Sequence, residues 1–380
     1  MVADEHPQGG SGDGRVMISV RDVSKQFPQS SGAAVNNLSL DIRQGEVVVL
    51  VGPSGCGKTT TMKMINRLVE PTSGTIEVDG TDVLQQDPVE LRRRIGYVIQ
   101  SIGLLPHRTV AQNIATVPKL VGWDEVRIRT RTDELVKIFD LDPEFLPRYP
   151  GELSGGQRQR VGVARALAVD PPVMLMDEPF AAVDPIVRAR LQDQFLEIQQ
   201  RIRKTIVFVT HDIDEAIKMA DRIAILNRGA KVEQYATPEQ ILREPANRFV
   251  EDFVGAERGL KRLALVKVSG IDVEEGPVVS PSATREEAVR EMERFGFDWT
   301  SVVDGGELLG WVDRELLEGR SRVGEVKPRK FGAYVTARDS LRQALDSIVT
   351  SRTQVAVVVN EGQQYRGILT LERISREILV

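Results

Sequence analysis

The run GPSGCGKT at residues 52–59 constrains the fold of this chain more than any other feature of its sequence. It follows an apolar run, residues 47–51, and opens a segment in which Met62, Ile65 and Leu68 recur at helical spacing. A strand, a glycine-rich loop and a helix in this order form the context in which G-x-x-x-x-G-K-[ST] binds phosphate. The glycines let backbone N–H groups surround phosphate oxygens, and the helix N-terminus adds the positive end of its dipole. A glycine-rich turn without a ligand is the alternative interpretation.

Side chains of this loop have predicted roles of their own. Lys58 can reach the β- and γ-phosphates of a nucleotide, and Thr59 can offer its hydroxyl to Mg²⁺. Cys56 is the only cysteine of the chain, and we interpret it as a small packing residue, with a functional thiol as the weaker alternative. The predicted nucleotide-binding residues of the loop are Gly52, Pro53, Ser54, Gly55, Cys56, Gly57, Lys58, Thr59 and Thr60.

A second apolar run, residues 173–176, ends in the acids Asp177 and Glu178. If this run is a strand beside the phosphate loop, Asp177 would hold Mg²⁺ directly or through water. Glu178 would act as the general base that polarises the attacking water. On their own, two acids at the end of a strand also fit an ordinary solvated sheet edge, so both assignments depend on the phosphate loop.

A third motif, LSGGQ at residues 153–157, precedes the helical run RQRVGVARALAV. A serine and two glycines at the start of a helix form another anion-binding corner. The alternative interpretation is that Ser154 only caps the helix after a glycine-rich entry. The chain thus carries two elements suited to phosphate, far apart in its sequence.

The spacing of apolar residues predicts an α/β fold for the first part of the chain. Three short apolar runs suit strands buried on both faces of a parallel sheet, and helical patterns lie between them. Three other runs alternate apolar and polar side chains, as in an antiparallel accessory sheet with one wetter face. The first set comprises residues 47–51, 173–176 and 205–210, and the second comprises residues 16–20, 38–42 and 75–80.

Composition restricts the class of protein. The chain has 380 residues, enough for two or three domains, and 55 acidic against 50 basic residues, which argues against a nucleic-acid-binding protein. One cysteine and three histidines provide neither a disulfide framework nor a cysteine-rich zinc site. No apolar run is long enough to span a bilayer, and the polar residues 1–14 predict a flexible tail rather than a secretion signal. We therefore expect a soluble, cytoplasmic chain.

The C-terminal part of the chain contains an internal repeat. Residues 276–292 align with residues 332–348, so that Ala288 matches Ala344. Each copy predicts a strand, a capped helix, a strand, a turn, a strand and a helix. Two copies of about 50 residues predict a pseudo-symmetric pair that shares one core, because a single copy is small to fold alone. The predicted segments are a nucleotide-binding domain at residues 15–254, a linker at residues 255–261, and the repeat at residues 262–380, divided into about 262–322 and 323–380.

The order of these motifs resembles the ATP-binding subunits of ABC transporters, whose signature is LSGGQ. The resemblance implies that ATP binds together with Mg²⁺ and that four further residues take part. Phe27 would stack on adenine, with a core aromatic as the alternative. Gln100 would contact Mg²⁺ and water, with a surface glutamine as the alternative, and His211 would reach the γ-phosphate. Asp184 would belong to a loop at the nucleotide site, although the AAV before it departs from the family pattern.

The resemblance also implies a head-to-tail dimer with two ATP molecules between the chains. Ser154 and Gly156 of one chain would bind the γ-phosphate of the nucleotide held by the other, with Gly155 and Gln157 beside them. Closure of this dimer and hydrolysis would drive integral membrane permease subunits, which in turn engage a substrate-binding protein or domain. The chain would lie at the cytoplasmic face of the membrane.

The repeat resembles a tandem pair of CBS domains, which are regulatory modules. An ABC ATPase followed by such a pair is similar to the ATP-binding subunits of glycine betaine, carnitine and choline importers, and residues 56–74 and 101–123 look close to that subfamily. The pair would bind an adenine nucleotide or dinucleotide, sense ionic strength through anionic lipid, or only hold the dimer together, and these alternatives stay open. The basic residues Lys327, Arg329 and Lys330 are a hypothetical contact for lipid or nucleotide, with an ordinary solvated turn as the alternative.

Other functions fit parts of the sequence. An importer ATPase for a different small solute, such as an amino acid or a polyamine, is one alternative, and the CBS pair argues against it. A soluble ABC ATPase that acts on DNA or ribosomes is another, but the long coiled-coil insertion or second ATPase core usual in that class is not visible. A CBS sensor with a dead ATPase is the last, and the intact Lys58, Asp177, Glu178 and His211 argue against it.

Overall fold

The computed structural model describes residues 14–28, 32–99, 103–181, 183–360 and 362–379. The chain forms two compact units, Met1–Val254 and Gly255–Val380. Each unit has hydrophobic clusters of its own. The predicted tail, residues 1–14, lies outside the described residues except for Gly14.

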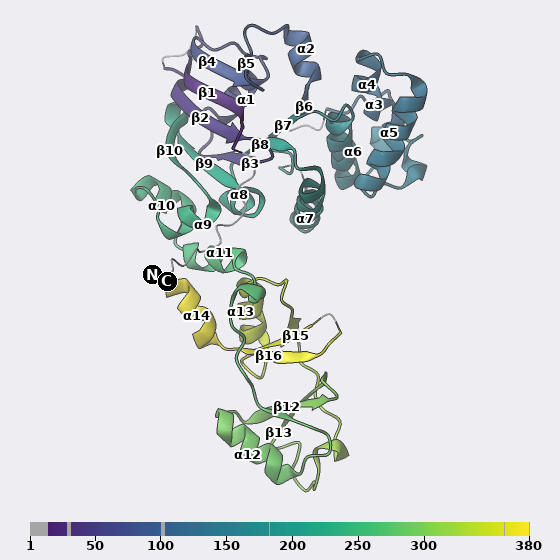
Figure 1. Ribbon diagram of the computed structural model, residues 1–380, viewed down its shortest axis with the longest axis vertical. Helices are drawn as coiled ribbons and strands as arrows, with labels where there is room; N and C mark the ends of the chain where they lie inside the picture. The colour runs from purple at the N-terminus through teal and green to yellow at the C-terminus, as the bar shows by residue number, and fades with distance from the viewer. Residues whose placement is uncertain (1–13, 29–31, 100–102, 182, 361, 380) are drawn as a thin grey trace, which may run out of the picture. The chain divides into compact units, whose positions relative to one another are not determined.

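A six-stranded sheet forms the centre of the first unit (Figure 1). In spatial order its strands are β10 (Lys231–Ala236), β9 (Arg222–Asn227), β3 (Val47–Val51), β8 (Thr205–Thr210), β7 (Val173–Asp177) and β6 (Ile95–Val98). Every neighbouring pair is parallel except β10 with β9. All residues of β3, β7 and β8 are buried, which confirms the predicted strands without a solvated face.

A smaller antiparallel sheet completes the β-structure of this unit. In spatial order its strands are β2 (Val35–Arg43), β1 (Val16–Lys25), β4 (Ser73–Val78) and β5 (Thr81–Asp82). All three pairings are antiparallel, as predicted. Along β2, Leu38, Leu40 and Ile42 are buried, and the residues between them are exposed or half-buried. The sheet therefore has one apolar and one wetter face.

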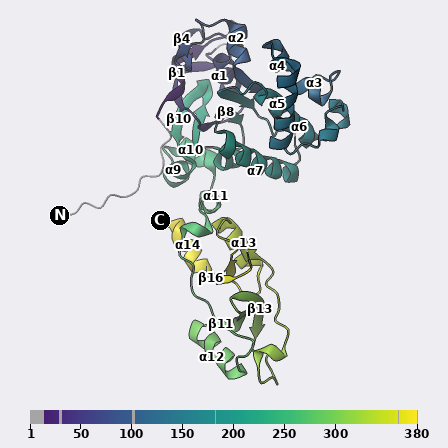
Figure 2. The ribbon, with the colours of Figure 1, turned by 45° about the vertical axis from the view of Figure 1, so that its right-hand side comes forward.

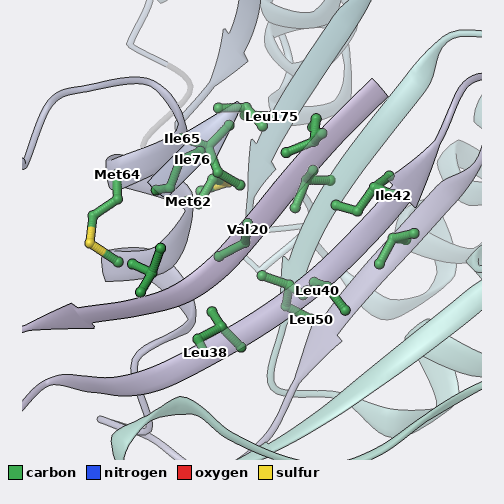
Figure 3. Packing of buried hydrophobic residues seen from close by; sticks show 14 of the residues in the cluster. Val20, Leu38, Leu40, Ile42, Leu50, Met62, Met64, Ile65, Ile76 and Leu175 are labelled. Atoms are coloured by element: carbon green, nitrogen blue, oxygen red, sulfur yellow. The ribbon is translucent and has the colours of Figure 1, made fainter. Parts of the chain in front are cut away.

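Helix α1 (Lys58–Ile65) packs against strands of both sheets. Its Met62 and Ile65 belong to one buried cluster with Val20 of β1 and Leu50 of β3 (Figure 3). The two helix residues are at most 1% exposed, which confirms them as part of the apolar face. This packing fixes the start of α1, and with it the phosphate loop, against the central sheet.

The prediction that Leu68 shares this apolar face is wrong. The helix ends at Ile65, and Arg67 adopts a left-handed backbone with φ of 46°. The chain then turns back, and the N–H of Leu68 donates to the carbonyl of Lys63 at 2.8 Å, a common helix ending. Leu68 is consequently 46% exposed, because the helical period on which the prediction relied stops before it.

Four helices form a group at one side of the first unit in both ribbon views (Figures 1 and 2). They are α3 (Val110–Ile114), α4 (Thr116–Leu120), α5 (Glu125–Ile138) and α6 (Gly155–Leu167). Thr109, Asp124 and Ser154 start α3, α5 and α6 by accepting a hydrogen bond from an N–H in the first turn. The other helices of this unit are α2 (Pro88–Arg93), α7 (Pro185–Ile202), α8 (Ile213–Met219), α9 (Pro238–Arg243) and α10 (Arg248–Val254).

The second unit opens with α11 (Arg258–Leu265) and then repeats one pattern of strand, helix, strand and strand. The first copy comprises β11 (Val278–Val279), α12 (Arg285–Phe295), β12 (Trp299–Asp304) and β13 (Glu307–Asp313), and the second comprises β14 (Tyr334–Val335), α13 (Leu341–Thr350), β15 (Ala356–Val359), β16 (Tyr365–Leu369) and α14 (Leu371–Leu379). In each copy the first strand pair is parallel and the second antiparallel. Thr284 and Ser340 cap α12 and α13 at matching positions, as predicted.

The two copies share a hydrophobic cluster, as the repeat predicts. Trp299 and Trp311 of the first copy pack with Val357 of the second and with Phe331 of the connection between them. The rings of Trp299 and Phe331 meet edge to face with centroids 5.7 Å apart. The indole N–H of Trp299 also donates to the carbonyl of Thr353 at 3.2 Å, so the copies are joined by polar as well as apolar contacts.

Two features of the second unit differ from the predictions. The last helix expected in the first copy does not form, because residues 314–319 make turns that end at Gly319 with φ of 70°. A segment this short nucleates a helix poorly, whereas the matching segment of the second copy continues as the longer α14. In addition, part of the predicted linker, residues 255–261, belongs to α11, whose Leu263 is 1% exposed in the core of the second unit.

Candidate functional site

The phosphate loop connects β3 to α1, and its path requires glycine at two positions. Gly52 has φ of 155°, and a Cβ there would lie 2.1 Å from the carbonyl oxygen of Leu226. Gly57 has φ of 113°, and a Cβ there would lie 2.6 Å from the carbonyl oxygen of Ala34. Only glycine allows the backbone to pass this close to its neighbours.

The loop surrounds a cavity of about 230 Å³ at the start of α1. Gly57 is the N-cap of this helix and no side chain caps it, so the first-turn N–H groups are open to a ligand. Amides, hydroxyls and one ammonium thus face the same space. The residues that line the cavity are Ala34, Ser54, Gly55, Cys56, Gly57, Lys58, Thr59, Thr60 and Glu178.

Lys58 is a buried cation that forms no ion pair with a described carboxylate. The residue is 6% exposed, and its Nζ donates to the carbonyls of Gly52 at 2.7 Å and Pro53 at 3.0 Å. Among the described residues, no carboxylate lies within ion-pair distance of this Nζ. A buried charge is stable only with a partner, so the site favours an anion beside Lys58.

Thr59 and Asp177 join the loop to the end of β7. The Thr59 hydroxyl donates to Oδ1 of Asp177 at 3.0 Å. Asp177 is 8% exposed, and this burial, together with the nearby Glu178 carboxylate, raises the pKa of its carboxyl. A hydroxyl beside a carboxylate is the type of oxygen donor set that suits Mg²⁺, so these residues fit the predicted ion. Gln100, the third predicted ligand, lies outside the described residues.

Glu178 stands at the mouth of the cavity, next to His211. Its N–H donates to the carbonyl of Val209 at 2.9 Å, and its backbone is left-handed with φ of 44°. Such a conformation is costly for a residue with a side chain and recurs at functional sites. His211 follows β8, and its Nδ1 lies 3.2 Å from Oε2 of Glu178. The two predicted catalytic side chains therefore meet, although they are distant in the sequence.

Phe27 lies at the surface of the first unit rather than in its core. It follows the end of β1, and the Nζ of Lys25 lies 5.2 Å from its ring centroid. The N–H of Ala34, which lines the cavity, donates to the carbonyl of Lys25 at 2.8 Å and so connects the end of β1 to the cavity wall. Phe27 is 38% exposed, which excludes the core-aromatic alternative.

The LSGGQ residues do not line the phosphate-loop cavity of their own chain. Ser154 caps α6, because its Oγ accepts from the N–H of Gln157 at 3.3 Å while its own N–H donates to Oε1 of Gln157 at 2.7 Å. Gly155 and Gly156 form the first turn of this helix. Asp184 similarly caps α7 by accepting from the N–H of Ile186 at 3.0 Å. Within one chain, these residues therefore cap a helix or form its first turn.

Two polar features near the site have no counterpart in the sequence predictions. Tyr97 lies on β6 near Asp177. Burial, and to a smaller extent the Asp177 carboxylate, raises the pKa of Tyr97 to about 12. Gln192 of α7 donates from Nε2 to Oε1 of Glu215 in α8 at 3.0 Å, and both residues are less than a tenth exposed. The sequence signal that could have predicted the contact with Glu215 is Gln192 itself, a polar residue on the buried face of α7.

Membrane-spanning helices and clustered metal ligands are both absent from the described residues. No helix in this part of the chain combines the length and apolar character that a membrane crossing needs. The same residues contain no group of three or more histidines, cysteines or acids placed to hold a metal.

Residues 35–181 match a family model described as "ABC transporter", and residues 268–317 and 323–380 match that of the CBS domain. The chain is 48% identical over 361 residues to the "Glycine betaine/carnitine/choline transport ATP-binding protein OpuCA" of Bacillus subtilis (strain 168), covering 93% of this chain and 94% of that protein. It is 47% identical over 367 residues to the "Choline transport ATP-binding protein OpuBA" of the same organism, with the same coverage. A solved structure, the "Dimeric structure of a post-hydrolysis state of the ATP-binding cassette MJ0796 bound to ADP and Pi", matches with a TM-score of 0.53 at 33% identity and covers 58% of this chain and 99% of that chain.

The phosphate loop, the acids at the end of β7 and the helical group around α6 define an ATP-binding cassette. The second unit adds a pair of CBS domains. The chain belongs to the family of ABC transporter ATP-binding proteins that includes OpuCA and OpuBA. This membership confirms the predicted P-loop ABC ATPase fold with a C-terminal CBS pair, and it makes the chain an ATP-hydrolysing subunit of a transport system.

Proposed function

We propose that this chain hydrolyses ATP in the phosphate-loop cavity to power the import of a small quaternary ammonium osmoprotectant such as glycine betaine, choline or carnitine. The observation that carries the ATPase assignment is the buried Lys58, which has no carboxylate partner among the described residues and lies in a cavity that Glu178 also lines. The solute class rests on the relatives, whose names specify glycine betaine, carnitine and choline transport.

Each side chain of the cavity has a role that follows from its position. The loop amides and Lys58 bind the β- and γ-phosphates, and the exposed ring of Phe27 stacks on adenine. Thr59 and Asp177, with Gln100 as a further ligand, would hold Mg²⁺, which neutralises phosphate charge when it is bound. Glu178 accepts a proton from the attacking water. His211 contacts the γ-phosphate and holds the Glu178 carboxylate through their 3.2 Å contact.

A second copy of the chain completes the site. Ser154, Gly155, Gly156 and Gln157 do not line the cavity of their own chain, and the N–H groups at the start of α6 are suited to bind a γ-phosphate in trans. A head-to-tail dimer with two ATP molecules would bring this segment of one chain to the phosphate loop of the other, with Asp184 at the interface. The solved cassette with ADP and Pi is described as dimeric, which supports this arrangement.

The remaining partners are membrane proteins and a regulator. The dimer docks on integral permease subunits at the cytoplasmic face of the membrane, and a substrate-binding protein or domain delivers the solute to them. The CBS pair responds to an adenine nucleotide or to ionic strength at an anionic membrane. Nucleic acid is not a partner, because the chain is acidic overall.

Of the three basic residues in the hypothetical CBS contact, only Lys327 and Lys330 can be replaced without disturbing described ion pairs. Arg329 forms ion pairs with Asp313 and Glu315, and its guanidinium lies 5.2 Å from the Trp311 ring centroid. Replacing Arg329 would therefore disturb the fold, whereas Lys327 and Lys330 are exposed. The test is the double variant Lys327→Gln and Lys330→Gln in full transporter vesicles, and an unchanged response to salt and nucleotide removes this contact from the proposal.

The transport proposal is tested by uptake of labelled glycine betaine at high and low external osmolarity. Cells carrying the natural chain are compared with cells carrying Glu178→Gln, and labelled proline and a polyamine are measured in parallel. Osmotically stimulated betaine uptake that requires Glu178 is the expected result. If betaine uptake is the same in both strains while another solute depends on Glu178, the ATPase assignment stands and the solute class is wrong.

A further inference from the structure

A second cavity of the first unit, of about 220 Å³, lies among α5, α6 and α7. It shares no lining residue with the phosphate-loop cavity. Its apolar wall includes Phe180 and Phe195, whose rings meet edge to face at 6.4 Å, and Val163 of α6. Helix α6 begins at the LSGGQ residues and α7 begins after Asp184. The cavity is therefore lined by both helices whose N-termini are proposed to contact the partner chain.

Polar atoms without partners are concentrated in this cavity. Gln159 is 2% exposed, and neither its Oε1 nor its Nε2 has a hydrogen-bond partner among the described residues. The Nε of Arg160 and the Oε1 of Gln194 are buried and unpartnered as well. An unpaired buried donor or acceptor costs about 1–3 kcal/mol, so such groups in a native protein indicate a missing ligand or water.

The unpartnered atoms define the chemistry of a ligand. The Gln159 amide offers a donor and an acceptor side by side, and Arg160 Nε and Gln194 Oε1 add one further donor and one further acceptor to the lining. Their complement is a group that also carries a donor next to an acceptor, such as a carboxamide, a cyclic imide or the edge of a nucleobase. The charges that line the cavity nearly balance, because Asp140 and Glu197 compensate two of its three basic residues, so a neutral ligand fits better than a strongly charged one.

We propose that this cavity is a binding site for a small, neutral, planar molecule that carries an amide-like donor–acceptor group, held by Gln159 against the phenylalanine wall. The available volume is sufficient, since an apolar cavity of roughly 150 Å³ accepts a benzene ring. The site is distinct from the ATP site, and it lies beside the two helices whose N-termini face the proposed partner chain.

The test is titration of the purified full chain with benzamide, a single ring with one carboxamide, by isothermal titration calorimetry and ligand-observed NMR. Gln159→Leu removes both amide atoms while retaining a side chain of similar size. Gln200→Leu, on an exposed position of α7 that does not line the cavity, is the matched control. Saturable binding is expected for the natural chain and the control, and Gln159→Leu is expected to weaken it by about tenfold, because hydrogen bonds worth about 1.4 kcal/mol are lost.

Toluene, which has the ring without the amide, separates loss of recognition from loss of the cavity. Gln159→Leu should bind toluene at least as well as the natural chain, since its cavity becomes more apolar. If the variant is misfolded, as judged by its thermal transition, Ile198→Phe provides a second test by filling the cavity, and benzamide binding should then disappear. Absence of saturable benzamide binding to the natural chain, or equal binding by Gln159→Leu, means that water satisfies Gln159 and overturns the proposal.

Discussion

The hydroxyl of Thr59 donates to the Asp177 carboxylate at 3.0 Å and thereby connects the start of α1 to the end of β7. This contact lies at the floor of the nucleotide site, where both side chains are proposed to bind Mg²⁺. It holds a carboxyl whose pKa is raised by burial and by Glu178. The site is therefore arranged for its ligands at some expense to the stability of the protein without them.

Replacing Asp177 with Asn should stabilise the nucleotide-free protein at neutral pH. The raised pKa means that the native state binds this proton more tightly than the unfolded chain does. The stability that the carboxyl contributes is thus present below its ordinary pKa of 3.8 and is lost as the pH rises through the raised pKa. Asn keeps an acceptor for Thr59 and carries no charge.

We expect Asp177→Asn to raise the Tm by about 2–4 °C at neutral pH. Removal of the buried charge should add about 1 kcal/mol to the free energy of unfolding. The gain should shrink in acid, and ATP hydrolysis should be lost. Calorimetric melting over a pH series without nucleotide measures the first two effects. A Tm that falls at neutral pH, and falls less in acid, would contradict this account of the carboxyl.

Replacing Glu178 with Gln should stop hydrolysis and leave ATP binding intact. A general base contributes about 10²–10⁴ in rate, whereas the loop amides and Lys58 supply the binding contacts. The variant should accumulate as an ATP-bound dimer, detected by size-exclusion chromatography with light scattering. Lys58→Ala is the contrasting variant and should weaken nucleotide binding itself. Hydrolysis at the natural rate in Glu178→Gln would assign the base to another residue.

The buried contact between Gln192 and Glu215 should matter for stability. Glu215→Ala leaves the Gln192 amide without its acceptor in a buried position, at a cost of about 1–3 kcal/mol in the free energy of unfolding. Glu215→Gln retains an acceptor for this amide and should cost much less. Urea denaturation of the natural chain and both variants compares the two. Equal losses for Ala and Gln would show that the charge, and not the hydrogen bond, is what α7 and α8 require.

Removal of the CBS pair should be made at residue 255. A deletion that starts at residue 262 would divide α11, whose Leu263 belongs to the core of the second unit. The chain that ends at Val254 keeps its own clusters and should still hydrolyse ATP. We expect its activity to lack the dependence on ionic strength or adenine nucleotide that is proposed for the full chain. If only dimerisation is lost while that response persists, the pair holds the dimer together and does not act as a sensor.

Predictions that depended on neighbouring residues were confirmed most often. The buried strands, the strand–loop–helix order around residues 52–59 and the capped helix of each repeat copy all depend on a few adjacent side chains. The errors arose where a helical pattern was extended beyond a residue at which the chain turns. Leu68 lies beyond the left-handed Arg67, and the last helix of the first copy is cut off by a turn. The role of Gln100 stays a prediction, since it lies outside the described residues.

The sequence by itself determined the loop that is proposed to bind phosphate, because its amide donors and the start of α1 come from one continuous segment, Gly52 to Thr60. Only the tertiary structure decided which side chains meet there. His211 reaches Glu178 because β7 and β8 are neighbours in a parallel sheet and end at the same edge. The spacing of Asp212 and Glu215 fits a capping box, yet Glu215 turns inward to Gln192. Contacts between segments that are distant in the sequence determine which side chains are buried. A buried polar side chain then needs a hydrogen-bond partner, which only the tertiary structure supplies.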